Sequence, residues 1–501
     1  MGLRHMFLVL FVGAFVLTPA TQAANTKTTH NWTIPGGRKT VNGSFAGVER
    51  TFVKIMTEKN QTVRIPFRTL TSADREHLRA LLGDGHDWQL EGARTKVKGQ
   101  FAGFDGDRVA VLTADDRLVQ LQHKRLTRDN RRHIVLKVAL TEEDRLVGSW
   151  VGLHVSDHTT WQHRFEIARQ GTKLVMTDTV WRGLTTDQVA AAKRRRLRNA
   201  GPYPFSAIGE QQYDVLINDG KVELKGKRVR IVYLGPGYLK GTTWKPDTFT
   251  LTPVAPGYLV GTVGDAKTKQ NRMSIYFARE ELWNTPLTLE LELGKTHHIT
   301  CQDDSRYHYS LYLPPKYDHA RPSPVLINDS PGGNAKPLTT KMADELGWIM
   351  VGLKESSNGG VMQTAAENCA AVIFDLHRRV RVDSKRYYFS GFSGGSRRSA
   401  WRGVEYAEQC AGIFCIGAGY RQWTSGDRRG HYMVPPLHLP IYMLIGRGDK
   451  LNFEEVTKRV HPMAKKNRRT VIMKVHDGGH VWGEPALHET AVRWLDDQWQ
   501  R

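Results

Sequence analysis

A serine between two glycines is the strongest chemical signal in the sequence. Gly391-Phe-Ser393-Gly-Gly395 closes the apolar, strand-like run at residues 387–392, and a helical segment follows it. A tight turn from strand to helix crowds the backbone, so glycine is favoured on both sides of the serine. We predict that Ser393 is a nucleophile at the end of this strand. A glycine-rich turn without catalysis is the plainer alternative.

A base and a carboxylate that could activate this serine lie downstream, in the order Ser, Asp, His. Asp449 lies in the loop after the apolar run 441–445, and His480 lies in a glycine-rich segment after the last expected strand. The base must take the hydroxyl proton, and the carboxylate must hold the base in the correct tautomer. We therefore predict Asp449 as the acid and His480 as the base. The alternatives are His476 for the base, and Asp427, Glu454 and Glu455 for the acid.

Two glycine segments could supply the backbone donors that hold the oxyanion in an acyl-transfer reaction. Gly394 directly follows the serine, so its N–H is the expected first donor. The run 325–328 leads into Asp-Ser-Pro-Gly-Gly-Asn, in which we predict Gly333 as the second donor, with Gly332 nearly as suitable. A plain Pro-Gly-Gly turn is the alternative interpretation.

From about residue 295 the sequence alternates between strand-like and helix-like segments. This alternation predicts a mostly parallel sheet with helices on both faces. The helix expected at 362–379 carries apolar residues at helical spacing on one stripe, and so does the C-terminal segment. The expected strands are residues 309–313, 325–328, 348–353, 387–392, 413–417, 441–445 and 470–475.

Residues 298–501 resemble the α/β-hydrolase superfamily, nearest to secreted esterases of the polyhydroxybutyrate-depolymerase, feruloyl-esterase and dienelactone-hydrolase type. The residues that carry the resemblance are the G-x-S-x-G around Ser393, followed by Asp449 and His480 in that order. The resemblance implies an acyl-serine mechanism in which His480 deprotonates Ser393, while Gly394 and Gly333 hold the oxyanion. It implies no organic cofactor.

Three functions are compatible with these residues. The leading hypothesis is an exported carboxylesterase, with a polymer-borne ester as one form of substrate, because accessory β domains and a basic surface suit an insoluble or acidic substrate. A serine peptidase of the prolyl-oligopeptidase type would use the same residue order. A non-catalytic envelope- or matrix-binding protein on a hydrolase scaffold is the alternative from another class.

An internal repeat occupies the N-terminal part of the chain, with a shift of 97 − 41 = 56 residues. Val-Asn-Gly-Ser-Phe-Ala-Gly at 41–47 matches Val-Lys-Gly-Gln-Phe-Ala-Gly at 97–103, and the match continues without a gap. Alternating apolar residues in each copy predict small β units at 35–84 and 91–140. Both copies resemble the SH3-like Sla-homology domains, which implies binding or spacing rather than catalysis.

The segment 145–295 is rich in strand-like runs separated by turn signals, which predicts an antiparallel sandwich or barrel. Its opening Gly148-Ser-Trp150 is similar to the start of lipocalin-type barrels. Large aromatic residues in this segment are expected in the core or, as the alternative, on the surface for stacking on sugar rings. These residues are Trp161, Trp181 and Trp244.

The first 24 residues have the layout of a secretory signal peptide. Arg4 and His5 precede an apolar run at 6–17, and a small-residue stretch ends at Ala24. The apolar run is shorter than a bilayer-spanning helix. We expect cleavage and export of the mature chain to the periplasm or the exterior, without a transmembrane span. An uncleaved N-terminal anchor is the alternative.

The net charge of the chain indicates which partners it can attract, and the spacing of its cysteines and histidines indicates whether it can bind a metal. The chain has a formal net charge of +22 and a pI of about 9.8, which would attract anionic polymers or surfaces. In an exported protein we expect an acidic polysaccharide or envelope rather than nucleic acid, and we expect the basic run 193–196 in a solvated loop. No metal is expected, because neither the cysteines nor the histidines have metal-ligand spacing. The four cysteines are Cys301, Cys369, Cys410 and Cys415. The sequence does not decide whether Cys410 and Cys415 form a disulfide.

Overall fold

The computed structural model divides the chain into two compact units, Met1–Thr141 and Glu142–Arg501. The expected signal peptide at 1–24, the basic run 193–196 and Asp427 lie outside the described residues. Within the described residues, no helix is long and apolar enough to cross a membrane. The structure describes residues 29–34, 39–49, 51–59, 61–104, 108–137, 142–156, 159–182, 207–233, 241–244, 248–263, 273–284, 286, 291–419, 439–466 and 468–500.

The first unit holds two copies of one small β motif. In each copy four antiparallel strands pair in chain order, and a 3-10 turn and a helix follow the last strand. The apolar residues that alternate in the sequence are buried, among them Val53 and Ile55 in one copy and Val109 and Val111 in the other. The first copy comprises β1 (Thr29–Thr33), β2 (Thr40–Glu49), β3 (Phe52–Thr57), β4 (Thr62–Pro66) and α1 (Ser72–Leu82); the second comprises β5 (Gly85–Trp88), β6 (Val97–Phe104), β7 (Arg108–Thr113), β8 (Leu118–Gln122) and α2 (Arg128–Lys137).

Each copy begins one strand earlier than the repeat in the sequence indicated. Trp32 in β1 and Trp88 in β5 are equivalent residues (32 + 56 = 88), and both are fully buried. Their indole N–H groups donate to Gly43 O and Gly99 O, each at 3.0 Å. The sequence comparison missed this strand because the two copies share only a histidine and the tryptophan there.

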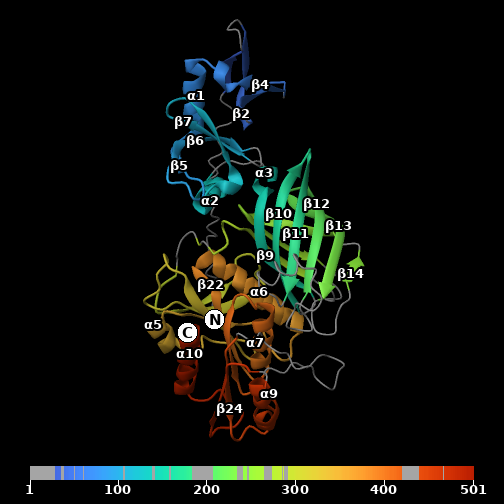
Figure 1. Cartoon of the computed structure of the whole chain (residues 1–501), viewed down its shortest axis with the longest axis vertical. Coiled ribbons are helices and arrows are strands. Elements are labelled where there is room, and N and C mark those ends of the chain that lie inside the picture. Colours follow the sequence, from blue (N-terminus) through green and yellow to red (C-terminus); the bar gives the residue numbers. More distant parts are fainter. Residues whose placement is uncertain are drawn as a thin grey trace, which may run out of the picture. The chain divides into compact units, whose positions relative to one another are not determined.

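The second unit contains a closed barrel of eight antiparallel strands after the short helix α3 (Glu142–Leu146) (Figure 1). The sequence predicted either a sandwich or a barrel, and the structure has the barrel. Neighbouring strands follow one another in the chain, and β17 pairs with β9 to close the barrel, while β14 pairs with β13 alone. The strands are β9 (Gly148–Ser156), β10 (Thr159–Gln170), β11 (Lys173–Arg182), β12 (Ala207–Asn218), β13 (Lys221–Tyr233), β14 (Gly241–Trp244), β15 (Thr248–Ala255), β16 (Tyr258–Val263) and β17 (Met273–Arg279).

Several aromatic residues of the barrel are buried. Trp150 is 1% exposed, and the guanidinium carbon of Arg279 lies 5.8 Å from the centre of its ring. Trp161 and Trp181 are also buried, so the structure places both in packed surroundings rather than on an exposed sugar-binding face. The side chain of Trp244 lies outside the described set.

A mixed sheet of eight strands forms the rest of the second unit, in the order β18-β19-β21-β20-β22-β23-β24-β25. The pairs β18–β19 and β19–β21 are antiparallel, and the other pairs are parallel, as the alternation in the sequence predicted. The edge strand β18 was not expected from the sequence, because its Thr-His-His-Ile-Thr has little apolar character. The strands are β18 (Thr296–Thr300), β19 (His308–Tyr312), β20 (Ser323–Asp329), β21 (Ile349–Leu353), β22 (Val382–Phe392), β23 (Cys410–Ile416), β24 (Ile441–Gly446) and β25 (Val471–His476).

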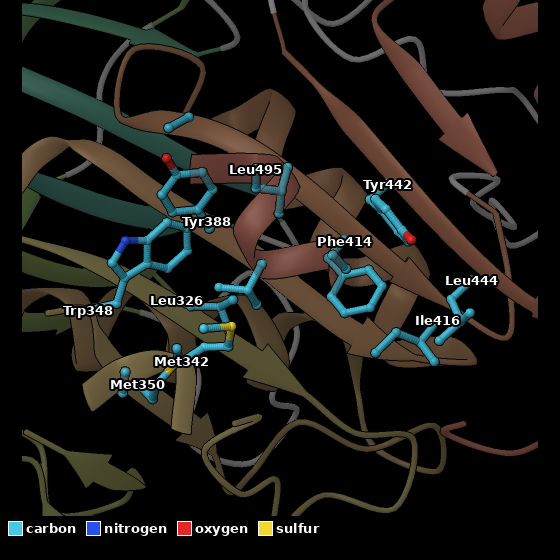
Figure 2. Packing of buried hydrophobic residues seen from close by; sticks show 14 of the residues in the cluster. Leu326, Met342, Trp348, Met350, Tyr388, Phe414, Ile416, Tyr442, Leu444 and Leu495 are labelled. Atoms are coloured by element: carbon cyan, nitrogen blue, oxygen red, sulfur yellow. The ribbon is translucent and has the colours of Figure 1, made fainter. Parts of the chain in front are cut away.

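Helices cover this sheet. Met342 of α5 and Leu495 of α10 pack in one apolar cluster with Leu326 and Phe414 of the sheet (Figure 2). Helices α6 and α7 contact both the sheet and the barrel. The helices are α5 (Thr340–Leu346), α6 (Met362–Arg379), α7 (Gly394–Glu405), α8 (Phe453–Glu455), the π-helical turn Val456–Val460, α9 (His461–Lys466) and α10 (Pro485–Trp499).

The barrel meets α7 at a buried carboxyl group. Glu405 is 4% exposed and accepts a hydrogen bond from the Thr160 backbone N–H at 2.8 Å. Gln162 Nε2 donates to the backbone carbonyl of Glu405 at 2.9 Å. Burial raises the pKa of the Glu405 carboxyl group to about 7, because the carboxylate form is poorly solvated there.

We expect the contribution of Glu405 to the stability of this unit to fall as the pH rises from about 4.5 to about 7. The pKa of Glu405 is higher in the folded chain than in the unfolded chain, so the folded chain retains the proton across this window. Each pH unit then costs at most about 1.4 kcal/mol of unfolding free energy. Thermal unfolding between pH 4.5 and 8 measures this slope, and Glu405→Gln should reduce it. An equal slope in the variant would contradict the assignment.

Candidate active site

The expected nucleophile lies between a strand and a helix. β22 ends at Phe392 and α7 begins at Gly394, so Ser393 is the single residue between them. Its backbone has φ 53° and ψ −116°, a strained conformation that persists only where the surroundings hold it. The Ser393 N–H donates to Ile416 O of the neighbouring strand at 2.8 Å. The turn therefore presents this serine beyond the carboxyl end of the strand.

Close backbone contacts explain the glycines around the serine. A Cβ on Gly391 would lie 2.5 Å from the carbonyl carbon of Gly395. A Cβ on Gly395 would lie 2.5 Å from Asp329 O, at the end of β20. Both distances are far below a van der Waals contact, so any side chain at these positions would force the turn apart. The spacing G-x-S-x-G thus has a steric cause.

The structure brings the three residues of the expected triad together. His480 Nε2 lies 2.9 Å from Ser393 Oγ, and His480 Nδ1 lies 2.8 Å from Asp449 Oδ2. Asp449 is 1% exposed, and its other carboxylate oxygen accepts the N–H groups of Leu451 and Asn452 at 2.9 and 3.0 Å. A carboxylate fixed in this way can orient an imidazole that takes the proton of a serine.

Glycines hold the loop of the acid against the loop of the base. A Cβ on Gly446 would lie 2.1 Å from Gly479 O. The Gly448 N–H donates to Gly478 O at 2.9 Å. Side chains at the closest of these contacts would separate the two loops, and the carboxylate would then lose its contact with the imidazole.

The alternative acid and base residues make other contacts. His476 Nδ1 accepts the Gly478 N–H at 3.1 Å, a local contact at the end of β25. Glu454 is exposed and pairs with Lys458 at 2.6 Å, and Glu455 lies 3.7 Å from an arginine of α7. None of these side chains hydrogen-bonds to Ser393 in the part of the chain that the structure describes.

One aromatic ring packs beside the imidazole and a second packs against the first, and neither was expected from the sequence. The ring centroid of Phe392 lies 4.7 Å from that of His480 and 5.0 Å from that of Trp482. Phe392 directly precedes the nucleophile and Trp482 lies two residues after the base, which was the signal that could have identified them. The Phe392 ring limits the rotation of the imidazole on one side.

The two residues expected to hold the oxyanion have different backbone contacts. Gly394 is the first residue of α7, a position whose N–H has no partner within the helix. The Gly333 N–H instead donates to Ser330 O at 3.1 Å and closes a turn, so it is already engaged. Gly332, the alternative, forms an isolated β-bridge with Ser357.

A buried charge cluster lies beside this loop, and the sequence analysis missed it too. Asp329, the last residue of β20, is 0% exposed and pairs with two arginines of α7. Arg398 Nη2 donates to Asp329 Oδ1 at 2.9 Å, and Arg402 Nη1 donates to Oδ2. Ser356 Oγ also donates to Oδ2, at 2.8 Å. Two arginines four residues apart share one face of a helix, and this spacing was the available signal.

The cysteines are buried thiols. All four are free, so no disulfide joins Cys410 and Cys415. Burial raises the pKa of the Cys369 and Cys415 thiols to about 11 and that of Cys410 to about 12, which disfavours thiolate nucleophiles near neutral pH. Among the described residues, no group of three His, Cys, Asp or Glu side chains has the geometry to hold a metal ion.

No model of a protein family and no curated protein matches the chain. Among solved structures, FphF, a fluorophosphonate-binding serine hydrolase of Staphylococcus aureus, is similar at 10% identity and a TM-score of 0.31, over 40% of this chain and 99% of its own. An S-formylglutathione hydrolase of Agrobacterium tumefaciens is similar at 14% identity and a TM-score of 0.30, over 42% and 98%. Thermogutta terrifontis esterase 2 is similar at 12% identity and a TM-score of 0.33, over 42% and 95%. Such distant likenesses carry no functional argument.

Proposed function

We propose that this chain is a serine hydrolase of the α/β-hydrolase type that cleaves carboxylic esters through an acyl-serine intermediate. The observation that carries the proposal is the continuous chain of contacts from Asp449 through His480 to Ser393. The strained backbone of Ser393 supports it, because strain of this kind persists where function requires it.

The reaction proceeds in two halves. His480 Nε2 takes the proton of Ser393 Oγ, and the oxygen attacks the ester carbonyl, whose oxyanion accepts the Gly394 N–H. His480 then returns the proton to the departing alcohol, which leaves an acyl-serine. A water molecule gives its proton to His480, attacks the acyl carbon and releases the acid, and the proton returns to Ser393.

We further propose that the enzyme is exported and that its substrate is an anionic or polymer-borne ester. The net charge of +22 favours binding to acidic polymers or surfaces. The two N-terminal β units would serve in binding or spacing, as their likeness to Sla-homology domains implies. The peptidase alternative rests on the shared order of Ser, Asp and His. Peptidases of the prolyl-oligopeptidase type carry an N-terminal propeller, whereas the β domain of the described residues is a closed barrel.

Labelling with a fluorophosphonate tests the proposal without knowledge of the substrate. We expect one adduct in the intact mass of the purified mature chain and none in a Ser393→Ala variant, because only an activated serine attacks the probe. Comparison of aryl esters with peptide amides then separates esterase from peptidase. A folded wild-type chain without an adduct would favour the non-catalytic binding protein.

A further inference from the structure

The side chain of Asn358 lies against the residue that follows the nucleophile. A Cβ on Gly394 would lie 1.9 Å from Asn358 Oδ1, 2.6 Å from its Cγ and 2.8 Å from its Nδ2. The amide of this asparagine therefore covers the first residue of α7, where the N–H expected to hold the oxyanion is located. Asn358 is exposed, so a bound substrate can reach it.

The orientation of the Asn358 amide is fixed. Its Oδ1 accepts a hydrogen bond from Arg398 Nη1 at 3.0 Å. A guanidinium group can only donate, so the oxygen of the amide must face it, and the Nδ2 donors must point elsewhere. Within the part of the chain that the structure describes, Nδ2 has no hydrogen-bond partner.

Arg398 is itself held in a buried position. It is 6% exposed, and its Nε and Nη2 donate to both carboxylate oxygens of Asp329 at 2.9 to 3.3 Å. Nη2 also donates to Ser330 O at 3.0 Å. The loop of Asn358 is tied to the same segment, because the Asn358 N–H donates to Pro331 O at 2.8 Å. A buried ion pair thus positions an exposed amide donor next to the nucleophile.

We infer that Asn358 is a catalytic residue whose Nδ2 donates the second hydrogen bond to the oxyanion, and that Arg398 is the positioning residue that orients it. The inference rests on the proposed function. The second hydrogen-bond donor to the oxyanion is then the side chain of Asn358 and not the N–H of Gly333, which donates to Ser330 O. Side-chain amides of asparagine can hold an oxyanion, and loss of one such donor lowers kcat by about 10² to 10³.

The test compares Asn358→Ala with a matched control, Gly359→Ala, in the full chain. The control changes the next residue of the same loop, where an added Cβ meets no atom within 4 Å. We expect Asn358→Ala to lower kcat for an aryl ester and the rate of Ser393 labelling by a fluorophosphonate about 10²-fold or more, with little change in KM. Gly359→Ala should match the wild type in all three.

A second variant tests the role of Arg398. Arg398→Lys keeps a positive charge beside Asp329 but loses the rigid fork that also reaches Asn358. We expect a kcat at least about 10-fold lower than that of the wild type, with KM unchanged. The double variant should be no slower than Asn358→Ala alone, because both changes act on the same interaction. Additive losses would overturn the positioning role of Arg398.

The two proposals fail in distinguishable ways. Equal labelling rates for Asn358→Ala, Gly359→Ala and the wild type would overturn the oxyanion role of Asn358 and leave the serine hydrolase proposal intact. No labelling of Ser393 in the wild type would overturn both.

Discussion

Replacement of Asp449 by asparagine is expected to lower kcat about 10⁴-fold. Asp449 Oδ2 faces His480 Nδ1, and its Oδ1 accepts the N–H groups of Leu451 and Asn452. An asparagine can keep the bonds to these two N–H groups, but its Nδ2 then faces the imidazole as a donor. The imidazole is driven into the tautomer with a proton on Nε2, which cannot take the proton of Ser393.

The size of the loss in kcat distinguishes Asp449 from other acidic residues nearby in the sequence. The control is Glu454→Gln, because Glu454 is exposed and pairs only with Lys458 among the contacts of the described residues. Initial rates on a short-chain aryl ester give kcat and KM for both variants, and thermal unfolding checks that each is folded. If Asp449→Asn retained more than about a hundredth of the wild-type kcat, Asp449 would not orient the base.

The nucleophile turn could be predicted from the sequence because its glycines are required by local steric contacts. The glycines around Ser393 mark a crowded turn whatever the rest of the fold, and the order Ser, Asp, His narrows the search for partners. Asn358 and Arg398 could not be found in this way. Their contact joins residues 40 positions apart, and it exists only once the sheet has formed.

The engagement of the Gly333 N–H in a turn could not be predicted for a related reason. Gly332 and Gly333 form a pattern that is typical both of an oxyanion loop and of a plain turn. The sequence does not show whether an N–H in such a pattern is free, since the partner, Ser330 O, is set by the backbone path.

The sequence also predicted part of the fold, namely the mostly parallel sheet, but not the closure of the barrel. Alternating strands and helices were sufficient for a mostly parallel sheet, because each element carries its own periodicity. The choice between a sandwich and a barrel could not be made, because strands in both alternate in the same way and only the pairing of β17 with β9 closes the barrel. The upstream tryptophans of the repeat were missed for a different reason, since the segments of β1 and β5 share only a histidine and the tryptophan.

Replacement of Asp329 by asparagine is expected to lower the free energy of unfolding by about 3 to 5 kcal/mol. The change removes the negative charge between Arg398 and Arg402, which are 6% and 3% exposed. Both guanidinium groups would then be buried beside a neutral amide, and the cost of their desolvation would no longer be offset. Urea denaturation measures the loss as a lower midpoint.

The part of the fold that loses stability distinguishes the buried cluster of Asp329, Arg398 and Arg402 from a surface ion pair. Hydrogen exchange should quicken first in peptides that cover β20 and α7, because Asp329 joins these two elements beneath the nucleophile turn. Asp477→Asn is the matched control, since Asp477 pairs with Arg447 on the surface with its side chain 97% exposed, and the midpoint should not change. If Asp329→Asn unfolded at the wild-type midpoint, the buried pair would not stabilise the fold, and the rigidity of the Asn358 amide would have to come from the loop itself.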